Sequence, residues 1–157
     1  MKILCDQMLG TLAKWLRILG FDTFYANNSI TDNELLHIAN KEKRIVISRD
    51  KELIIRGKKE NLTTIEINTT DLDEQLQQVL KLILIDEQFV LSRCIICNTI
   101  LKTIKRGLVQ GKVPKKVFEN NDEFWFCNMC NKYYWKGSHY EKILNKIDEI
   151  KKKTTPQ

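Results

Sequence analysis

Residues 1–22, MKILCDQMLGTLAKWLRILGFD, contain the pattern that decides the fold. The short apolar run at 3–5 predicts a buried strand, and apolar residues then recur at helical spacing from Leu9 to Leu19. Gly20 follows where such a helix would end. A buried strand that leads straight into an amphipathic helix is the repeating unit of parallel α/β sheets.

The alternation of strand and helix continues along the chain. A T-x-x-E pattern at Thr31 and Glu34 predicts a capping box at the start of the second helix. Gly57 is placed to close the third helix. The remaining elements are predicted as strands at 23–26, 44–48 and 63–67, a short helix at 51–56 and a long helix at 71–85. The fold class is therefore α/β, with a parallel sheet flanked by helices.

Four cysteines form two pairs, Cys94-Ile95-Ile96-Cys97 and Cys127-Asn128-Met129-Cys130, with 29 residues between them. Two-residue gaps let both sulfurs of a pair face one ion, so the spacing predicts a structural zinc site with four thiolate ligands in a zinc ribbon. The alternatives are two disulfides or four unrelated buried thiols. The fifth cysteine, Cys5, lies in an apolar run and is expected to be an inert buried thiol.

We expect a cytoplasmic protein without a membrane segment. The apolar run at 3–5 ends at Asp6, which is not the form of a secretory leader, and no later stretch approaches the roughly 18 apolar residues of a membrane span. A reducing cytosol disfavours the disulfide alternative.

Charge divides the 157-residue chain near the first cysteine pair. Residues 1–90 carry 12 Lys and Arg against 14 Asp and Glu, whereas 91–157 carry 14 against 6. The expected domains are 1–90 for the α/β part, 91–138 for the ribbon, and 139–157 for a C-terminal helix and basic tail. The basic second part suggests a grip on a polyanion, with a solvated lysine-rich tail as the simpler alternative.

Acidic residues follow the predicted strands. Asp6 follows the first strand, Asp50 follows the third, and Asp32 and Glu34 begin the second helix. Parallel strands place their carboxyl ends along one edge, so these carboxylates should converge and hold Mg²⁺ or Mn²⁺ for phosphodiester hydrolysis. Each acid also has an alternative role as a helix cap, and the two roles are compatible.

Five segments, MKILCDQMLG at 1–10, LAKWLRILGFD at 12–22, DNELL at 32–36, SRDKEL at 48–53 and KYYWKGSHY at 132–140, together resemble one family. It is the Mut7-C RNase domain, a PIN-like nuclease family with a C-terminal zinc ribbon.

The resemblance implies a PIN-like fold and metal-dependent RNA cleavage. It places Asp6, Glu34 and Asp50 on the acidic metal site, with Asp32 as a neighbour. For a fourth acid the candidates are Asp71 and Asp73.

Basic side chains suggest where RNA would bind. Lys14 and Arg17 follow Asp6 on the first helix and Arg49 precedes Asp50, so all three are candidates for phosphate contact, with a solvated surface as the alternative for the two on the helix. Six basic residues lie between the cysteine pairs: Lys102, Lys105, Arg106, Lys112, Lys115 and Lys116.

Aromatic residues cluster around the second cysteine pair: Trp125, Phe126, Tyr133, Tyr134 and Trp135. Rings beside lysines suit single-stranded RNA, although aromatics at strand spacing also build small cores. His139 lies in an S-x-x-E pattern that predicts the start of the last helix, and the metal site does not need it as a ligand.

We therefore expect a metal-dependent endoribonuclease with a basic RNA-binding ribbon. Two alternatives remain: a non-catalytic RNA-binding adaptor in RNA processing or ribosome assembly, and a phosphoryl-transfer receiver domain, for which the ribbon would have no purpose.

Overall fold

The computed structural model describes residues 1–154 and divides the chain into two compact units, Met1–Asn98 and Thr99–Gln157. The sequence placed the boundary at 90/91. The structure keeps 91–98 with the first unit, because the Arg17 side chain donates to the backbone of this segment. In turn, the side chains of Asn98 and Arg93 hydrogen-bond to the backbone of the preceding part of the unit. The last residues of the expected basic tail, 155–157, lie outside the described residues.

The first unit is built on the predicted parallel sheet. Its strands are β1 (Lys2–Cys5), β2 (Asp22–Tyr25), β3 (Ile45–Ser48) and β4 (Thr64–Glu66), in the order β2-β1-β3-β4. All three strand pairs are parallel. The α/β prediction is therefore confirmed.

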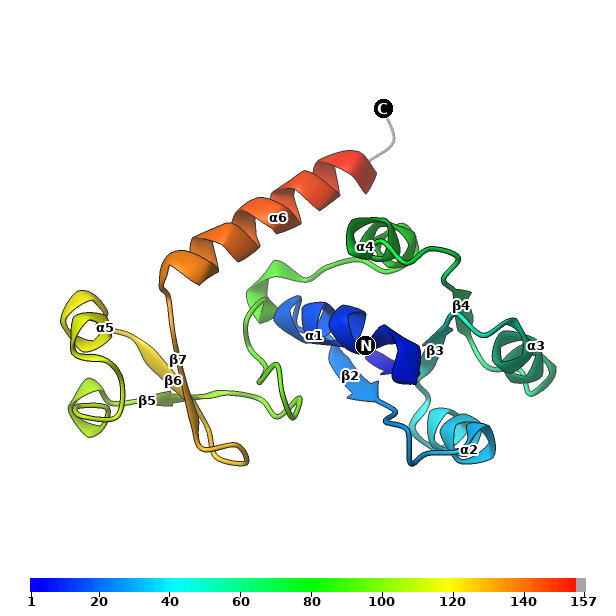
Figure 1. The fold of residues 1–157 in the computed structure, drawn as a ribbon, viewed down its shortest axis with the longest axis horizontal. Coiled ribbons are helices and arrows are strands. Elements are labelled where there is room, and N and C mark those ends of the chain that lie inside the picture. The colour runs from blue at the N-terminus through cyan, green and yellow to red at the C-terminus, as the bar shows by residue number, and fades with distance from the viewer. Residues whose placement is uncertain (155–157) are drawn as a thin grey trace. The chain divides into compact units, whose positions relative to one another are not determined.

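Helices cover both faces of this sheet (Figure 1). Helices α1 (Gly10–Ile18) and α4 (Leu72–Leu80) contact each other on one face, and α2 (Asp32–Glu42) and α3 (Lys51–Lys59) lie on the other. The 3-10 turns of this unit are η1 (Gln7–Leu9) and η2 (Glu87–Phe89).

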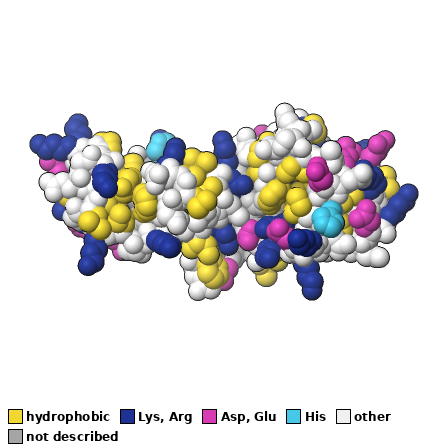
Figure 2. Space-filling model, turned by 90° about the horizontal axis from the view of Figure 1, so that it is seen from below, with side chains coloured by type: hydrophobic (Ala, Val, Ile, Leu, Met, Phe, Trp, Pro, Cys, Tyr) yellow, Lys and Arg dark blue, Asp and Glu magenta, His cyan; other side chains and the backbone are white. Residues whose placement is uncertain are grey.

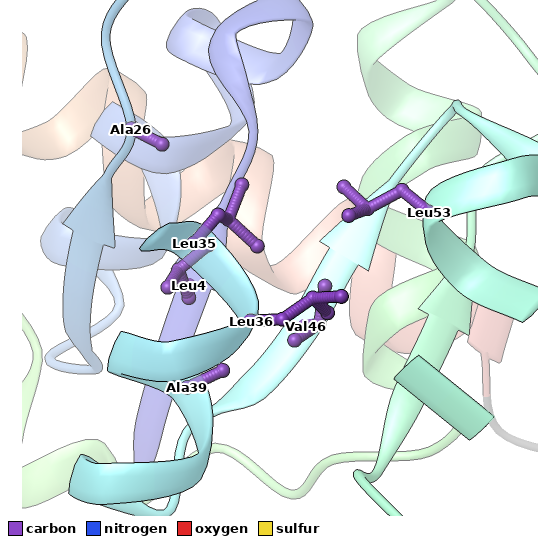
Figure 3. Packing of buried hydrophobic residues seen from close by; sticks show 7 residues of the cluster. All are labelled: Leu4, Ala26, Leu35, Leu36, Ala39, Val46 and Leu53. Carbon is purple, nitrogen blue, oxygen red and sulfur yellow. The ribbon is translucent and has the colours of Figure 1, made fainter. Parts of the chain in front are cut away.

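The core on the α2 and α3 face follows from strand alternation. Leu4 in β1 and Val46 in β3 point to this face, because successive strand residues alternate between faces. Side chains from the helices pack against them (Figure 3). The complete cluster is Leu4, Ala26, Leu35, Leu36, Ala39, Val46 and Leu53. Cys5 in β1 is also buried, as predicted, and burial raises the pKa of its thiol far above the usual value.

Two predicted helix ends are wrong. Helix α3 continues past Gly57 to Lys59, and this glycine is needed for packing instead: an added Cβ would lie 2.9 Å from Cγ2 of Thr64. Helix α4 ends at Leu80 rather than at residue 85. After it the chain closes in a turn, in which the N–H groups of Leu82 and Ile83 both donate to the carbonyl oxygen of Val79, and the helical pattern stops there.

The second unit holds a small antiparallel sheet, with strands β5 (Lys102–Ile104), β6 (Phe124–Cys127) and β7 (Lys132–Trp135) in that order. Helix α5 (Lys115–Asn120) connects β5 to β6, and α6 (Ser138–Thr154) ends the described chain. The 3-10 turn η3 covers Arg106–Leu108.

The second unit has a small aromatic core. Phe124 is fully buried, and its ring stacks on Phe118 of α5 with 6.4 Å between centroids. Helix α6 begins at Ser138 and His139, as predicted, and buries Ile147 and Ile150. Among residues 1–154, no helix is long and apolar enough to cross a membrane.

Candidate active site and metal centre

Asp6 stands directly after β1 and is buried, with 5% of its surface exposed. Its Oδ1 accepts a hydrogen bond from the backbone N–H of Met8 at 2.9 Å, so it caps η1. Its Oδ2 accepts a hydrogen bond from the hydroxyl of Ser48. Both carboxylate oxygens of Asp6 are therefore held in fixed directions.

Asp50 follows β3 and caps α3. Its Oδ1 accepts hydrogen bonds from the backbone N–H groups of Glu52 at 2.8 Å and Leu53 at 3.3 Å. Its own backbone N–H donates to Oγ of Ser48 at 2.8 Å. The buried hydroxyl of Ser48 thus links Asp6 to Asp50. In the described part of the chain, Oδ2 of Asp50 carries no hydrogen bond.

The two acids at the start of α2 differ in their surroundings. Asp32 is exposed, and its Oδ2 lies 3.4 Å from Nη1 of Arg56. Glu34 forms the predicted capping box: its Oε2 accepts hydrogen bonds from the backbone N–H and the hydroxyl of Thr31, both at 2.8 Å. These two bonds hold the pKa of Glu34 below its usual value.

A small pocket of about 50 Å³ brings three of the four predicted acids together. Asp6, Asp32 and Asp50 line it, and they come from three different segments at the carboxyl edge of the sheet. Glu34 lines instead a neighbouring open hollow of about 390 Å³, beside His37 and Ile38.

Asn27 also lines the pocket, although its sequence context did not indicate a site residue. It stands just past the carboxyl end of β2, the same kind of position as Asp6 after β1. Its Oδ1 accepts a hydrogen bond from the hydroxyl of Ser29 at 2.6 Å. The alternatives for a fourth acid, Asp71 and Asp73, do not line this pocket.

The three candidate phosphate-binding residues lie in different environments. Lys14 is exposed on α1, and Arg49 is half-buried between β3 and Asp50. Arg17 is buried, with 8% of its surface exposed, and its guanidinium donates to backbone carbonyl oxygens of the same unit. The donors Nε and Nη1 of Arg17 are therefore used within the fold.

The cysteine pairs meet in space. The sulfur atoms of Cys94, Cys97, Cys127 and Cys130 all lie within 4.8 Å of one another. Sulfurs bound to one tetrahedral zinc ion at about 2.3 Å would be about 3.8 Å apart, so this donor set fits zinc. Clustering of all four sulfurs favours one metal over two separate disulfides. Among the described residues, the pocket carboxylates form no comparably close group of three.

The family model of the Mut7-C RNase domain matches residues 1–147. The chain belongs to the Mut7-C RNase domain family. Neither a curated protein nor a solved structure matches it. Family membership confirms the resemblance seen in the sequence, and it suggests an RNase-type function with RNA as the substrate.

The second unit has a basic surface. Residues 99–157 carry 13 Lys and Arg against 6 Asp and Glu. All six basic residues selected from the sequence are exposed. Figure 2 shows lysine and arginine side chains standing out at the left end, where Figure 1 places β5 and α5.

Some of these basic side chains already contact groups within the second unit. The guanidinium of Arg106 lies 4.0 Å from the ring centroid of Phe118 and donates to the carbonyl oxygen of the same residue. Lys136 lies over the ring of Trp125 and forms an ion pair with Glu123 at 3.1 Å. Lysines without such contacts, among them Lys102 and Lys112, present their charge to solvent.

Strand alternation distributes the aromatic residues of the second unit between the two faces of its small sheet. Phe126 and Tyr133 are register partners on one face of the small sheet, with ring centroids 4.9 Å apart. Lys102 pairs with Phe126 on the neighbouring strand, so an exposed lysine stands beside a half-exposed ring pair. Trp125 and Tyr134 belong to the opposite face.

Proposed function

We propose that the protein is a metal-dependent endoribonuclease whose first unit is a PIN-like nuclease domain and whose second unit is an RNA-binding zinc ribbon. The observation that carries this proposal is the pocket lined by Asp6, Asp32 and Asp50 at the carboxyl edge of a parallel sheet. Ligands of open α/β sheets bind at this edge, and family membership supports RNA as the substrate.

Carboxylate oxygens are the donors that Mg²⁺ and Mn²⁺ prefer, so Asp6, Asp32 and Asp50 would hold one or two such ions. The bound ions would neutralise phosphate charge and lower the pKa of the attacking water. Glu34 would join these ligands only by leaving its capping box, so Asp32 is the third ligand that the geometry favours.

The chain's own groups supply orientation. The hydroxyl of Ser48 and the N–H of Met8 fix both oxygens of Asp6, and the N–H groups at the start of α3 fix one oxygen of Asp50. The second oxygen of Asp50 is left for a ligand in the pocket. Water would attack phosphorus as the bond from phosphorus to the leaving ribose oxygen breaks, and the leaving oxygen would take a proton from solvent, so that no covalent intermediate forms on the protein.

The substrate would be held by separate groups. Lys14 and Arg49 are the candidates for phosphate contact in the first unit. Arg17 is less suited, because its Nε and Nη1 already donate hydrogen bonds to backbone carbonyl oxygens. In the second unit, exposed lysines would bind the RNA backbone and the Phe126–Tyr133 ring pair would stack on a base.

The test is cleavage of a labelled single-stranded RNA in Mn²⁺ by the wild type, Asp6→Asn and Asp50→Asn. Asp71→Asn is the matched control, because Asp71 caps α4 as Asp50 caps α3 but does not line the pocket. Asparagine caps helices about as well as aspartate, so Asp50→Asn and Asp71→Asn should both fold.

We expect cleavage to fall about a hundredfold or more in Asp6→Asn and Asp50→Asn, and to be unchanged in Asp71→Asn. A further pair identifies the third ligand: Asp32→Asn should lose activity, whereas Glu34→Gln should keep it. Equal cleavage in all variants would come from a contaminating nuclease and would overturn the assignment.

A non-catalytic RNA-binding adaptor is the second candidate. This alternative is favoured by the structural role of each of the three pocket acids. Asp6 and Asp50 cap helices, and Asp32 forms an ion pair with Arg56. An adaptor in RNA processing or ribosome assembly would bind RNA equally well in the presence of Mn²⁺ and in the presence of a chelator. It would not cut the RNA under either condition.

A further inference from the structure

Arg17 joins three segments of the first unit. Its side chain leaves α1, and Nε donates to the carbonyl oxygen of Thr23 in β2 at 3.0 Å. Nη1 donates to the carbonyl oxygens of Ile95 at 3.0 Å and Ile96 at 2.8 Å. Ile95 and Ile96 are the two residues between the first pair of cysteines, so a buried guanidinium holds the loop that presents their sulfurs.

A second set of contacts fastens the same loop to the edge of the sheet. The backbone N–H of Thr23 donates to Oδ1 of Asn98 at 3.0 Å, and Nδ2 of Asn98 donates to Oδ1 of Asp22 at 2.9 Å. Asn98 also closes the loop, because its N–H donates to the carbonyl oxygen of Cys94 at 2.9 Å. The loop therefore covers the edge strand β2.

Arg93, the residue before the loop, makes a third set of hydrogen bonds between the loop and the rest of the unit. Its Nε donates to the carbonyl oxygen of Gly20 at 3.2 Å, and its Nη1 donates to the carbonyl oxygen of Asn98 at 2.9 Å. All of these contacts lie within the Met1–Asn98 unit.

The charges agree with this arrangement. Four thiolates and one Zn²⁺ together carry a net charge of about −2, and a guanidinium stays protonated under all ordinary conditions. A positive group that also hydrogen-bonds the backbone around the ligands would stabilise the loaded site more than the empty one.

We propose that Arg17 is a positioning residue of the cysteine metal site: it holds the Cys94–Cys97 loop against the α/β unit in the geometry that binds zinc. Half of the metal site is then part of the α/β fold. Because coupling between binding and structure is reciprocal, zinc in turn stabilises α1 and β2 of the first unit. The proposal stands apart from RNA cleavage and does not depend on it.

The first test is zinc affinity of the full-length chain, measured by competition with a chromophoric chelator at fixed pH. Arg17→Met removes the donors, and Lys14→Met is the matched control, since Lys14 is exposed on the same helix one turn earlier. We expect zinc binding to weaken about 10- to 100-fold in Arg17→Met and to stay within about twofold of wild type in Lys14→Met. Wild-type affinity in Arg17→Met would overturn the proposal.

The same variants separate positioning from a general effect on stability. If Arg17 only stabilised the fold, Arg17→Met would lower the unfolding temperature equally with zinc and with chelator. The proposal requires the gain in unfolding temperature on adding zinc to shrink in Arg17→Met and to be kept in Lys14→Met. An undiminished gain would contradict it.

A measurement on the wild type covers the case in which Arg17→Met does not fold. Amide hydrogen exchange is compared with zinc and after chelation, following the N–H of Thr23 and, as control, the N–H of Val46, which donates to the carbonyl oxygen of Thr63 at 3.0 Å. Protection of Thr23 should be lost on chelation while that of Val46 is kept. Unchanged protection of Thr23 would show that the loop does not depend on the metal.

Discussion

At the scale of single residues, the pocket acids combine two roles. Asp6 and Asp50 each use one oxygen to cap a helix. Capping leaves the other oxygen of each group for a second partner: the hydroxyl of Ser48 for Asp6, and the pocket for Asp50. A cap is thus a means of aiming a carboxylate, because its backbone bonds fix the side-chain rotamer at the sheet edge.

Ser48→Ala tests this view of the site. Removing the hydroxyl leaves Oδ2 of buried Asp6 without its donor, which should cost about 1–3 kcal/mol in the free energy of unfolding and lower RNA cleavage. Ser92→Ala is the control, because the Ser92 hydroxyl donates only to the carbonyl oxygen of Phe89, away from the pocket. Urea unfolding and cleavage assays measure both effects. Normal cleavage in Ser48→Ala would mean that Asp6 needs no positioning partner.

At the scale of elements, the end of α1 sets how the chain reaches β2. The N–H of Phe21 donates to the carbonyl oxygen of Leu16, and the N–H of Gly20 donates to that of Arg17, both at 3.0 Å. This pair of bonds is a Schellman motif, which needs a left-handed residue, and Gly20 has φ +90°. An added Cβ there would lie 2.3 Å from the carbonyl oxygen of Phe89. Conformation and packing therefore both require glycine.

Gly20→Ala can be compared with Gly111→Ala, since Gly111 also has a positive φ, of +76°, but open space around its Cα. The left-handed conformation alone should cost about 1–2 kcal/mol in Gly111→Ala. In Gly20→Ala the contact with Phe89 adds a backbone clash, for a total of about 3–5 kcal/mol. Urea unfolding followed by circular dichroism measures the difference. Equal losses would mean that the chain around Phe89 moves aside.

At the scale of the whole molecule, acidic and basic functions are separated along the chain. The pocket carboxylates belong to the first unit, whereas 13 of the 26 Lys and Arg residues lie in the 59 residues of the second, against only 6 acids. This division suits the proposed hydrolase, in which the carboxylates of the first unit would bind metal ions and the basic residues of the second unit would hold a polyanion.

Salt dependence of RNA binding tests the proposed role of the second unit. Each lysine–phosphate contact with a single strand contributes about 0.7 to the slope of log K against log salt. Lys102→Ala should lower the slope by about that amount, because Lys102 stands beside the Phe126–Tyr133 ring pair. Lys81→Ala, at the exposed end of α4, is the control and should leave the slope unchanged. Fluorescence anisotropy over a salt series measures it. If both variants lowered the slope of log K against log salt equally, the effect would come from the overall net charge and not from a phosphate contact at Lys102.

The sequence by itself determined the order of strands and helices in the first unit, the capping box at Thr31 and the pairing pattern of the four clustered cysteines. These features depend on local rules: alternation, helical spacing, capping and the spacing of cysteines. It also placed Asp6 and Asp50 at one edge, because parallel strands share the direction of their carboxyl ends.

Only the tertiary structure decided which way individual side chains turn. The carboxylate of Glu34 is hydrogen-bonded in its own capping box and lines a different hollow from the other acids, although the family resemblance placed Glu34 on the metal site and Asp32 only beside it. Arg17 reaches carbonyl groups 78 and 79 residues further along the chain, although its sequence position suggested a phosphate contact. Both outcomes depend on which partner lies within hydrogen-bond reach after the chain has packed, and local spacing carries no information about such long-range contacts.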